Sequence, residues 1–173
     1  MIALGIIVLL AVVAAVLYNR IVAARIRCDE ALSGIDVALA KRYQSLSGIL
    51  ETVRGYARHE LEVLQQLTKL RSGMTLQQKQ QLSEEYDQAE RQILVVAEQY
   101  PQLKASANYM QLQDTIRDAE EHLQAARRLY NANAAAYNEA IQSFPTCLIA
   151  MLMQAEPRSY FQASQQERQN ITL

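Results

Sequence analysis

The sequence contains no tryptophan, only 5 glycines and 3 prolines, and 2 cysteines among its 173 residues. Few glycines and prolines leave few places to turn, and Ala, Leu, Gln, Glu and Arg favour helix, so we expect an all-α chain. The net charge of −1, with acidic and basic residues interspersed, excludes the basic surface of a nucleic-acid-binding protein. Glycine-rich phosphate loops, nucleophile elbows and metal-ligand clusters are also missing. We therefore predict a non-enzymatic chain with no cofactor.

An apolar run opens the chain. Residues 1–17, MIALGIIVLLAVVAAVL, carry no charged or hydrogen-bonding side chain. Spanning a hydrocarbon core of roughly 30 Å takes about 17–20 such residues in a helix. Tyr18 and Arg20 follow, an aromatic residue and a charge of the kind found at a membrane surface. We predict a transmembrane anchor over residues 1–18, with Tyr18 and Arg20 at the membrane boundary.

Two other interpretations of this run are weaker. A cleaved signal peptide would begin with basic side chains and end at a small-residue cleavage site. Here Ala14-Ala15 lies inside the run and Ala23-Ala24 follows Arg20, so a retained anchor is favoured. A soluble core helix with apolar residues all round would need a larger protein to surround it.

The flanking charges predict orientation. Arg20, Arg25 and Arg27 follow the run and no basic side chain precedes it, so the positive-inside bias favours a cytoplasmic C-terminal domain. Asp29 and Glu30 weaken this bias, which leaves a periplasmic or extracellular domain as the alternative.

A first apolar face continues beyond the anchor with spacings of three or four. Without an interrupting proline, this helix would run out of the membrane to Arg71, a reach of roughly 80 Å, with Gly48 and Gly55 as bends. Ser72-Gly73 would end it, and Thr75 with Gln78 would form a capping box for the next helix. The face consists of Leu32, Ile35, Leu39, Tyr43, Leu46, Leu50, Val53, Ala57, Leu61, Leu64, Leu67 and Leu70.

Two further helices show heptad seams. The second ends at Tyr100-Pro101, because the residue before proline is driven from helical geometry. Such seams predict a left-handed antiparallel bundle in up-down-up order, with a long hairpin kinked at Pro101 as the alternative. The second seam is Leu82, Tyr86, Ala89, Ile93, Val96 and Tyr100; the third alternates large Tyr109, Ile116, Leu123, Tyr130, Tyr137 and Phe144 with Leu112, Ala119, Ala126, Asn133 and Ala140.

Five segments in order give the chain a family resemblance, from the anchor to about Phe161. They are Tyr18-Asn19-Arg20, SGIDVALAKRY (33–43), ETVRGYARHE (51–60), YPQLKA (100–105) and ARRLYNANAAAYNEAIQSFP (126–145). Together they resemble the LemA family of bacterial membrane proteins. The resemblance implies one N-terminal membrane span, an antiparallel helical bundle and a location in the bacterial cytoplasmic membrane, and it brings no established reaction.

Three departures from the family pattern affect the details. Leu32 stands where these proteins commonly carry tryptophan, and residues 153–156 replace a glycine-aromatic segment. Ser47 stands where a proline often breaks the first long helix, so the resemblance here favours an unbroken helix.

The two histidines and the charged residues around them predict structural roles rather than metal binding or catalysis. His59-Glu60 lacks the second histidine of a zinc motif, since residue 63 is valine, and His122 lies on a polar face beside two glutamates. Asp36, Arg42, Glu51 and His59 line one helix and do not converge on a substrate, so we expect structural ion pairs from them. Tyr130 and Tyr137 are expected in the core, whereas the roles of Asn131 and Asn138 stay open.

Residues 146–173 form an apolar C-terminal segment and a polar tail after a bundle over residues 19–145. The apolar part is too short to span a bilayer, and it either folds back over the bundle or contacts another copy or lipid. The candidate contact residues are Cys147, Leu148, Ile149, Met151, Leu152 and Met153. Cys28 and Cys147 are expected as isolated thiols, although a disulfide stays open.

These features predict a membrane-anchored helical scaffold whose partners are the lipid bilayer and further copies of the chain. An accessory or signalling subunit of another membrane protein is the alternative. An enzyme whose site forms only between copies is less favoured. If the first helix is unbroken near residues 18–27, the anchor and the bundle form one rod, and ordering of copies in the membrane is passed on to the bundle. A flexible break there would make the anchor a simple tether.

Overall fold

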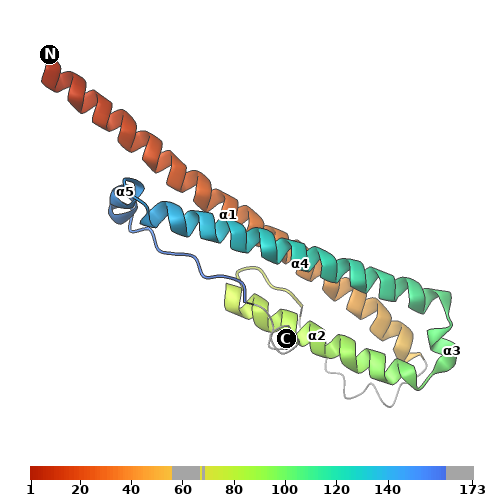
Figure 1. Ribbon diagram of the computed structural model, residues 1–173. Helices are drawn as coiled ribbons and strands as arrows, with labels where there is room; N and C mark the ends of the chain where they lie inside the picture. Colours follow the sequence, from red (N-terminus) through yellow and green to blue (C-terminus); the bar gives the residue numbers. More distant parts are fainter. Residues whose placement is uncertain (56–66, 68, 163–173) are drawn as a thin grey trace, which may run out of the picture. The chain divides into compact units, whose positions relative to one another are not determined.

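The computed structural model describes residues 1–55, 67 and 69–162. Figure 1 shows the helices found there: α1 (Ile2–Arg54), α2 (Leu76–Glu98), α3 (Pro101–Lys104), α4 (Ala107–Gln142) and α5 (Thr146–Leu152). No strand occurs in these ranges, so the predicted all-α class is confirmed.

The helices build two compact units, and α1 and α4 contribute to both. Of the described residues, unit 1 combines Met1–Ser33 with Arg128–Tyr160, and unit 2 combines those of Gly34–Arg127 with Phe161 and Gln162. Helix α1 is unbroken through residues 18–27, which lie wholly in unit 1. The apolar run therefore continues as helix into the packed part of that unit.

Paired residues give the helix directions in unit 2. On α1, Arg42 contacts Glu120 of α4, and a Cβ on Gly48 would lie 3.3 Å from Leu112, so these two helices are antiparallel. The pairs between α1 and α2 follow the opposite order along the chain. Asp36 pairs with Lys79, and Arg42 pairs further along with Asp87 and Glu90. Residue numbers rise together, so α1 and α2 run in the same direction, and α4 is antiparallel to both.

Helix α1 ends earlier than the sequence predicts. We expected helix to Arg71 and a tight reversal at Gly73, but α1 ends at Arg54, and residues 67 and 69–71 are not helical. Gly55 follows directly, and glycine is a poor helix former. Lys79, in the first turns of α2, pairs with Asp36 of α1, so α2 begins beside residue 36. The expected reversal occurs instead between α2 and α4.

The chain reverses direction between α2 and α4 at the helix end predicted at Tyr100-Pro101. Helix α2 ends at Glu98, and Pro101 occupies the first turn of α3, where its missing N–H costs nothing. At the other end of α2, the Thr75 N–H donates to Gln78 Oε1 (2.8 Å) and the Gln78 N–H donates to Thr75 Oγ1 (3.2 Å). Gly73 has a φ of 81°. The capping box and the left-handed glycine are both confirmed.

The heptad seams are confirmed over most of their length. In α2 the first four seam residues are buried, but Ala97 replaces Val96 and Tyr100 in the core. In α4 the large seam residues are buried from Tyr109 to Tyr137, whereas Phe144 is 81% exposed. That expectation was wrong because α4 already ends at Gln142. Both tyrosines of the Tyr-Asn steps lie in the core, as predicted.

Tyr86 on α2 gives unit 2 a predicted sensitivity to alkaline pH. Its side chain is fully buried, with its ring centroid 6.3 Å from that of Tyr43, and burial raises the pKa of Tyr86 far above its ordinary value. The unfolded chain would release this proton near pH 10, well before the folded chain. We expect full stability below pH 10 and a falling free energy of unfolding above it, measured by urea titration between pH 8 and 11.

Tyr86→Phe is the control for this effect because it keeps the ring and removes the ionising group. The variant should show a shallower decline above pH 10 than the parent chain. An identical decline in both proteins would assign the alkaline sensitivity to other groups, such as the buried tyrosines Tyr109 and Tyr130, whose pKa values burial also raises.

Candidate functional site

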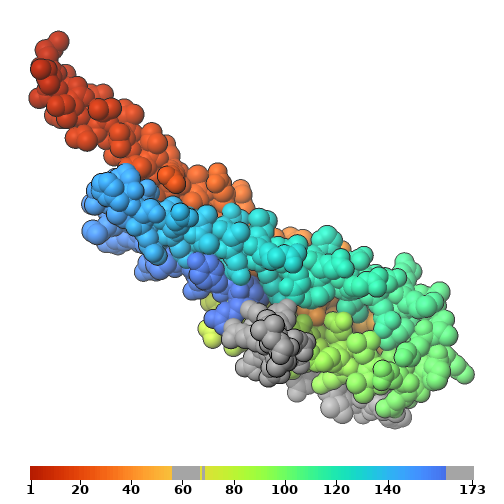
Figure 2. All heavy atoms as spheres, in the orientation of Figure 1, coloured from red at the N-terminus to blue at the C-terminus, as the bar shows by residue number. Residues whose placement is uncertain are grey.

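The apolar stretch of α1 stands free of the rest of unit 1. Its large side chains from Ile2 to Val16 are exposed, and Figure 2 shows this stretch, in red, clear of the remaining atoms of the unit. Among the described residues, α1 is the one helix long and apolar enough to cross a membrane by length and composition. The predicted boundary residues Tyr18 and Arg20 are exposed at the end of this stretch.

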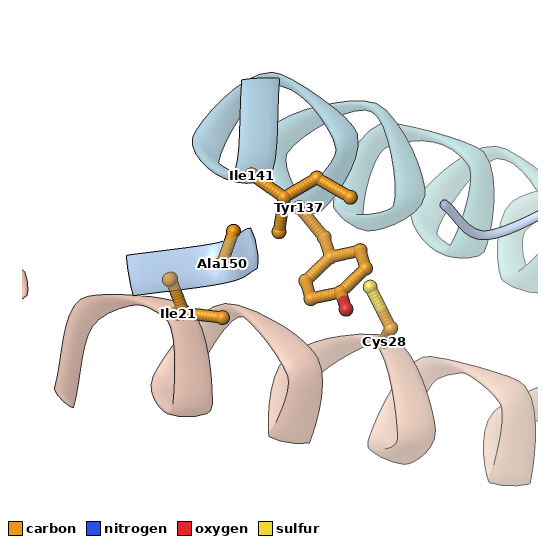
Figure 3. Packing of buried hydrophobic residues seen from close by; sticks show 5 residues of the cluster. All are labelled: Ile21, Cys28, Tyr137, Ile141 and Ala150. Carbon is orange, nitrogen blue, oxygen red and sulfur yellow. The ribbon is translucent and has the colours of Figure 1, made fainter. Parts of the chain in front are cut away.

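The packed part of unit 1 begins one turn later, at Ile21. Here α1 and α4 lie antiparallel, and Ile21, Cys28, Tyr137, Ile141 and Ala150 form one buried cluster. Figure 3 shows the Tyr137 ring reaching from α4 toward α1, with Ala150 of α5 near Ile21. Helix α5 thus joins the core where the bare stretch of α1 ends.

The six candidate contact residues lie on α5 and at its C-cap. Some face the core of unit 1, and the others are exposed. Ile149 and Met153 pack against the cluster, and Cys147 is partly buried. Leu148, Met151 and Leu152 are exposed by 55%, 77% and 82%. Part of the segment therefore folds back on the unit, and the other part remains uncovered.

The chain after α5 is held to α4 by Asn138. The Asn138 amide nitrogen donates to the Arg158 carbonyl oxygen (2.9 Å), and the Arg158 N–H donates to Asn138 Oδ1 (2.7 Å). The Tyr130 hydroxyl donates to the Ser159 carbonyl oxygen (2.9 Å), and Arg158 pairs with Asp29 (2.8 Å). Asn138 therefore fixes the returning chain, a role that its heptad position alone did not reveal.

Both cysteines are free thiols. Cys28 is buried in unit 1, and burial raises its pKa in spite of the opposing effect of Arg158. A raised pKa leaves little reactive thiolate near neutral pH. Cys147 is partly exposed on α5. The expectation of isolated thiols is confirmed in this structure.

A buried charge cluster occupies the middle of unit 2. Arg42 contacts Asp87 (2.6 Å), Glu120 (2.8 Å) and Glu90 (2.9 Å), and its side chain is only 3% exposed. Burial alone would lower the Arg42 pKa, but Glu120, Asp87 and Glu90 outweigh it and raise the pKa above its ordinary value. One guanidinium thus binds α1 to both α2 and α4.

Two further basic side chains pack in unit 2. Lys79 pairs with Asp36 (2.6 Å) and is almost fully buried. Arg127 donates to the Ser83 hydroxyl and lies 4.9 Å from the centre of the Phe161 ring. The prediction of structural ion pairs is confirmed for Asp36 and Arg42, but the carboxylates from α2 and α4 were missed. Asp87, Glu90 and Glu120 each directly follow a seam residue of α2 or α4, and this place beside the core was their signal in the sequence.

The remaining sequence candidates that the structure describes do not gather into a site. His122 is exposed as predicted, Glu51 is exposed, and His59 lies outside the described residues. No metal-binding group of His, Cys, Asp and Glu occurs in the part of the chain that the structure describes. An open hollow of about 220 Å³ in unit 2 is mainly apolar, with Leu46, Ile93 and Ile116 in its lining.

Comparison with known proteins assigns the chain to a family. The LemA family pattern matches residues 31–173, and Protein LemA of Metamycoplasma hominis is 30% identical over 148 residues, 83% of this chain and 68% of that protein. The chain belongs to the LemA family. The resemblance seen in its five segments is confirmed. The LemA match begins at residue 31, so the anchor is supported by the apolar stretch of α1 itself.

A second relative of this LemA-family chain covers a smaller part. Magnetosome protein MamQ of Magnetospirillum gryphiswaldense is 30% identical over 69 residues, which is 40% of this chain and 25% of MamQ. The chain therefore matches only a quarter of the length of that relative.

Proposed function

We propose that this LemA-family protein is a non-catalytic, membrane-anchored helical scaffold that self-associates at the membrane. The observation that carries the proposal is the uncovered apolar stretch of α1, which enters the packed core of unit 1 without a break in the helix. The lipid bilayer is the partner that suits such a stretch, since backbone groups within a helix satisfy one another. A protein that binds unit 1 would therefore be held next to the bilayer.

The use of charge in unit 2 supports a structural role. Arg42 and Lys79 are engaged with carboxylates from neighbouring helices, and both are buried between helices. Such pairs fix the arrangement of α1, α2 and α4. Self-association then supplies a platform made from repeated copies of the same helical units.

The test of self-association is the native mass of the full chain. We expect the protein purified in mild detergent to show masses of two or more copies of its 19.5 kDa chain by native mass spectrometry. These multiples should persist when the detergent is raised so that micelles outnumber protein chains, which controls for accidental sharing of a micelle. A single copy at every detergent concentration would contradict the scaffold. A fixed complex with a different protein would instead support an accessory subunit.

We further propose that the helical units lie on the cytoplasmic side of a bacterial cytoplasmic membrane, because Arg20, Arg25 and Arg27 are exposed just after the apolar stretch. In a background with both native cysteines replaced by serine, Asp118→Cys places an exposed thiol on α4. We expect a membrane-impermeant maleimide to label this thiol only after the cells are permeabilised. Equal labelling in intact cells would place the units outside.

A further inference from the structure

Helix α5 and the residues before it leave an apolar surface uncovered. Phe144, Leu148, Met151 and Leu152 are exposed by 81%, 55%, 77% and 82%, and together they are called the α5 apolar face. Four large apolar side chains within nine residues form a patch of the kind that marks a membrane or protein contact.

The position of α5 in unit 1 indicates which contact this is. Ala150 of α5 is buried with Ile21 of α1, three residues after the predicted boundary residue Tyr18. Three helical residues correspond to roughly 5 Å along the axis. The headgroup layer on each side of a bilayer is about 5–8 Å thick. Helix α5 therefore lies at the depth of the headgroup layer when the preceding stretch spans the hydrocarbon core.

Figure 1 also shows this arrangement within unit 1. Helix α5 lies at the end of α4, and the apolar stretch of α1 extends beyond that end without a neighbouring helix. Arg20 and Arg25 on this part of α1 are exposed and can meet lipid phosphates at the same depth. An apolar face beside basic side chains is the composition of a segment that lies in a membrane interface. A helix of seven residues is too short to cross the bilayer.

We propose that the α5 apolar face inserts into the interfacial layer of the bilayer and gives unit 1 a second membrane contact beside its anchor. The inference rests on the anchor of the proposed function. A single helix crossing a bilayer is free to rotate about its axis, whereas a second contact to one side of that axis fixes the face of unit 1 that is turned to the lipid. A second copy seated on α5 is the competing occupant, and the experiment below separates the two.

The absence of tryptophan makes a depth measurement direct, because one introduced tryptophan is the sole indole in the chain. Leu152→Trp reports on the α5 apolar face. Leu129→Trp is the matched control, also an exposed leucine of unit 1, located on α4 two turns before Tyr137. Val8→Trp reports on the anchor. Each full-length variant is reconstituted into vesicles of phosphatidylcholine and phosphatidylglycerol, with and without lipids brominated near the headgroup end of the acyl chains.

We expect brominated lipid to reduce the fluorescence of Leu152→Trp at least twofold, with blue-shifted emission and little quenching by aqueous iodide. Leu129→Trp should show the opposite pattern. A blue-shifted Leu152→Trp that brominated lipid does not quench would mean that protein covers the face, and this would overturn the proposal. Strong iodide quenching of Leu152→Trp would also overturn it. If Val8→Trp itself is not quenched by deeply brominated lipid, the anchor has failed rather than the inference about α5.

A paired substitution tests the competing occupant independently. Leu148→Glu with Leu152→Glu places two charges on the α5 apolar face and leaves its buried side unchanged. We expect the native mass in detergent to match that of the parent chain, while the lipid quenching of a tryptophan introduced at Met151 falls to the level of Leu129→Trp. A drop in native mass with helicity retained would assign the face to contacts between copies and overturn the lipid proposal.

Discussion

Replacing Arg42 by methionine is expected to destabilise unit 2 by about 3–5 kcal/mol, the usual cost of removing one partner from a buried ion pair. Methionine fills much of the same volume, but it leaves Asp87, Glu90 and Glu120 with no compensating charge between α1, α2 and α4. The free energy of unfolding should be measured for the full chain in detergent by urea titration, with circular dichroism at 222 nm as the signal.

Arg117→Met is the matched control for this substitution. Arg117 also pairs with a carboxylate, that of Asp114, but both side chains are about two-thirds exposed, 68% and 65%. Exposed pairs of this kind contribute at most about 1 kcal/mol. Combining Arg42→Met with Glu120→Gln should recover part of the loss, because one uncompensated charge is removed. Equal and small effects at Arg42 and Arg117 would show that the cluster does not stabilise the unit.

Replacing Tyr137 by alanine is the second substitution with a large expected effect, in unit 1. Its ring fills the space between α1, α4 and α5, and it is almost fully buried. Deleting a buried aromatic ring typically costs about 3–5 kcal/mol through lost burial and the cavity left behind. We expect faster amide hydrogen exchange throughout α5 and residues 153–160, because this part of the chain packs on the tyrosine and on neighbouring Asn138.

Two controls define what the Tyr137 result means. Tyr137→Phe keeps the ring and should stay close to the parent chain, whereas Leu152→Ala removes an exposed side chain and should change stability by less than about 0.5 kcal/mol. Exchange in unit 2 should change less than exchange in α5 if the two units open separately. Unaltered exchange in α5 after Tyr137→Ala would show that the ring does not hold that helix in place.

The features that the sequence predicted correctly depend on neighbours in the chain. The capping box of Thr75 and Gln78 is formed by residues three apart, and Gly73 adopts its conformation through its own backbone. Helical periodicity likewise placed Tyr109, Leu123 and Tyr137 in the core, because one face of a helix is defined by spacing alone. The family resemblance was predicted correctly for a similar reason, since it was carried by short segments in a fixed order.

The features that were missed depend on parts of the chain that meet only after folding. Helix α1 ends at Arg54, and no periodicity shows that α2 begins beside residue 36 and runs in the same direction as α1. Arg42 lies on an apolar seam, but its carboxylate partners come from two other helices. Asn138 directly follows the seam residue Tyr137, but its partner, the backbone of Arg158, has no signature in side-chain patterns.

The makeup of unit 1 has a consequence for how the protein is made. The Cys28 side of its core lies in the first 33 residues, and the Tyr137 side belongs to the segment from residue 128 to residue 160. A ribosome adding about 5–20 residues per second needs on the order of 5–20 s to progress from one to the other. During that interval the first segment exists without its packing partner. We therefore expect the folding of this unit to depend on translation speed more than that of a unit built from consecutive residues.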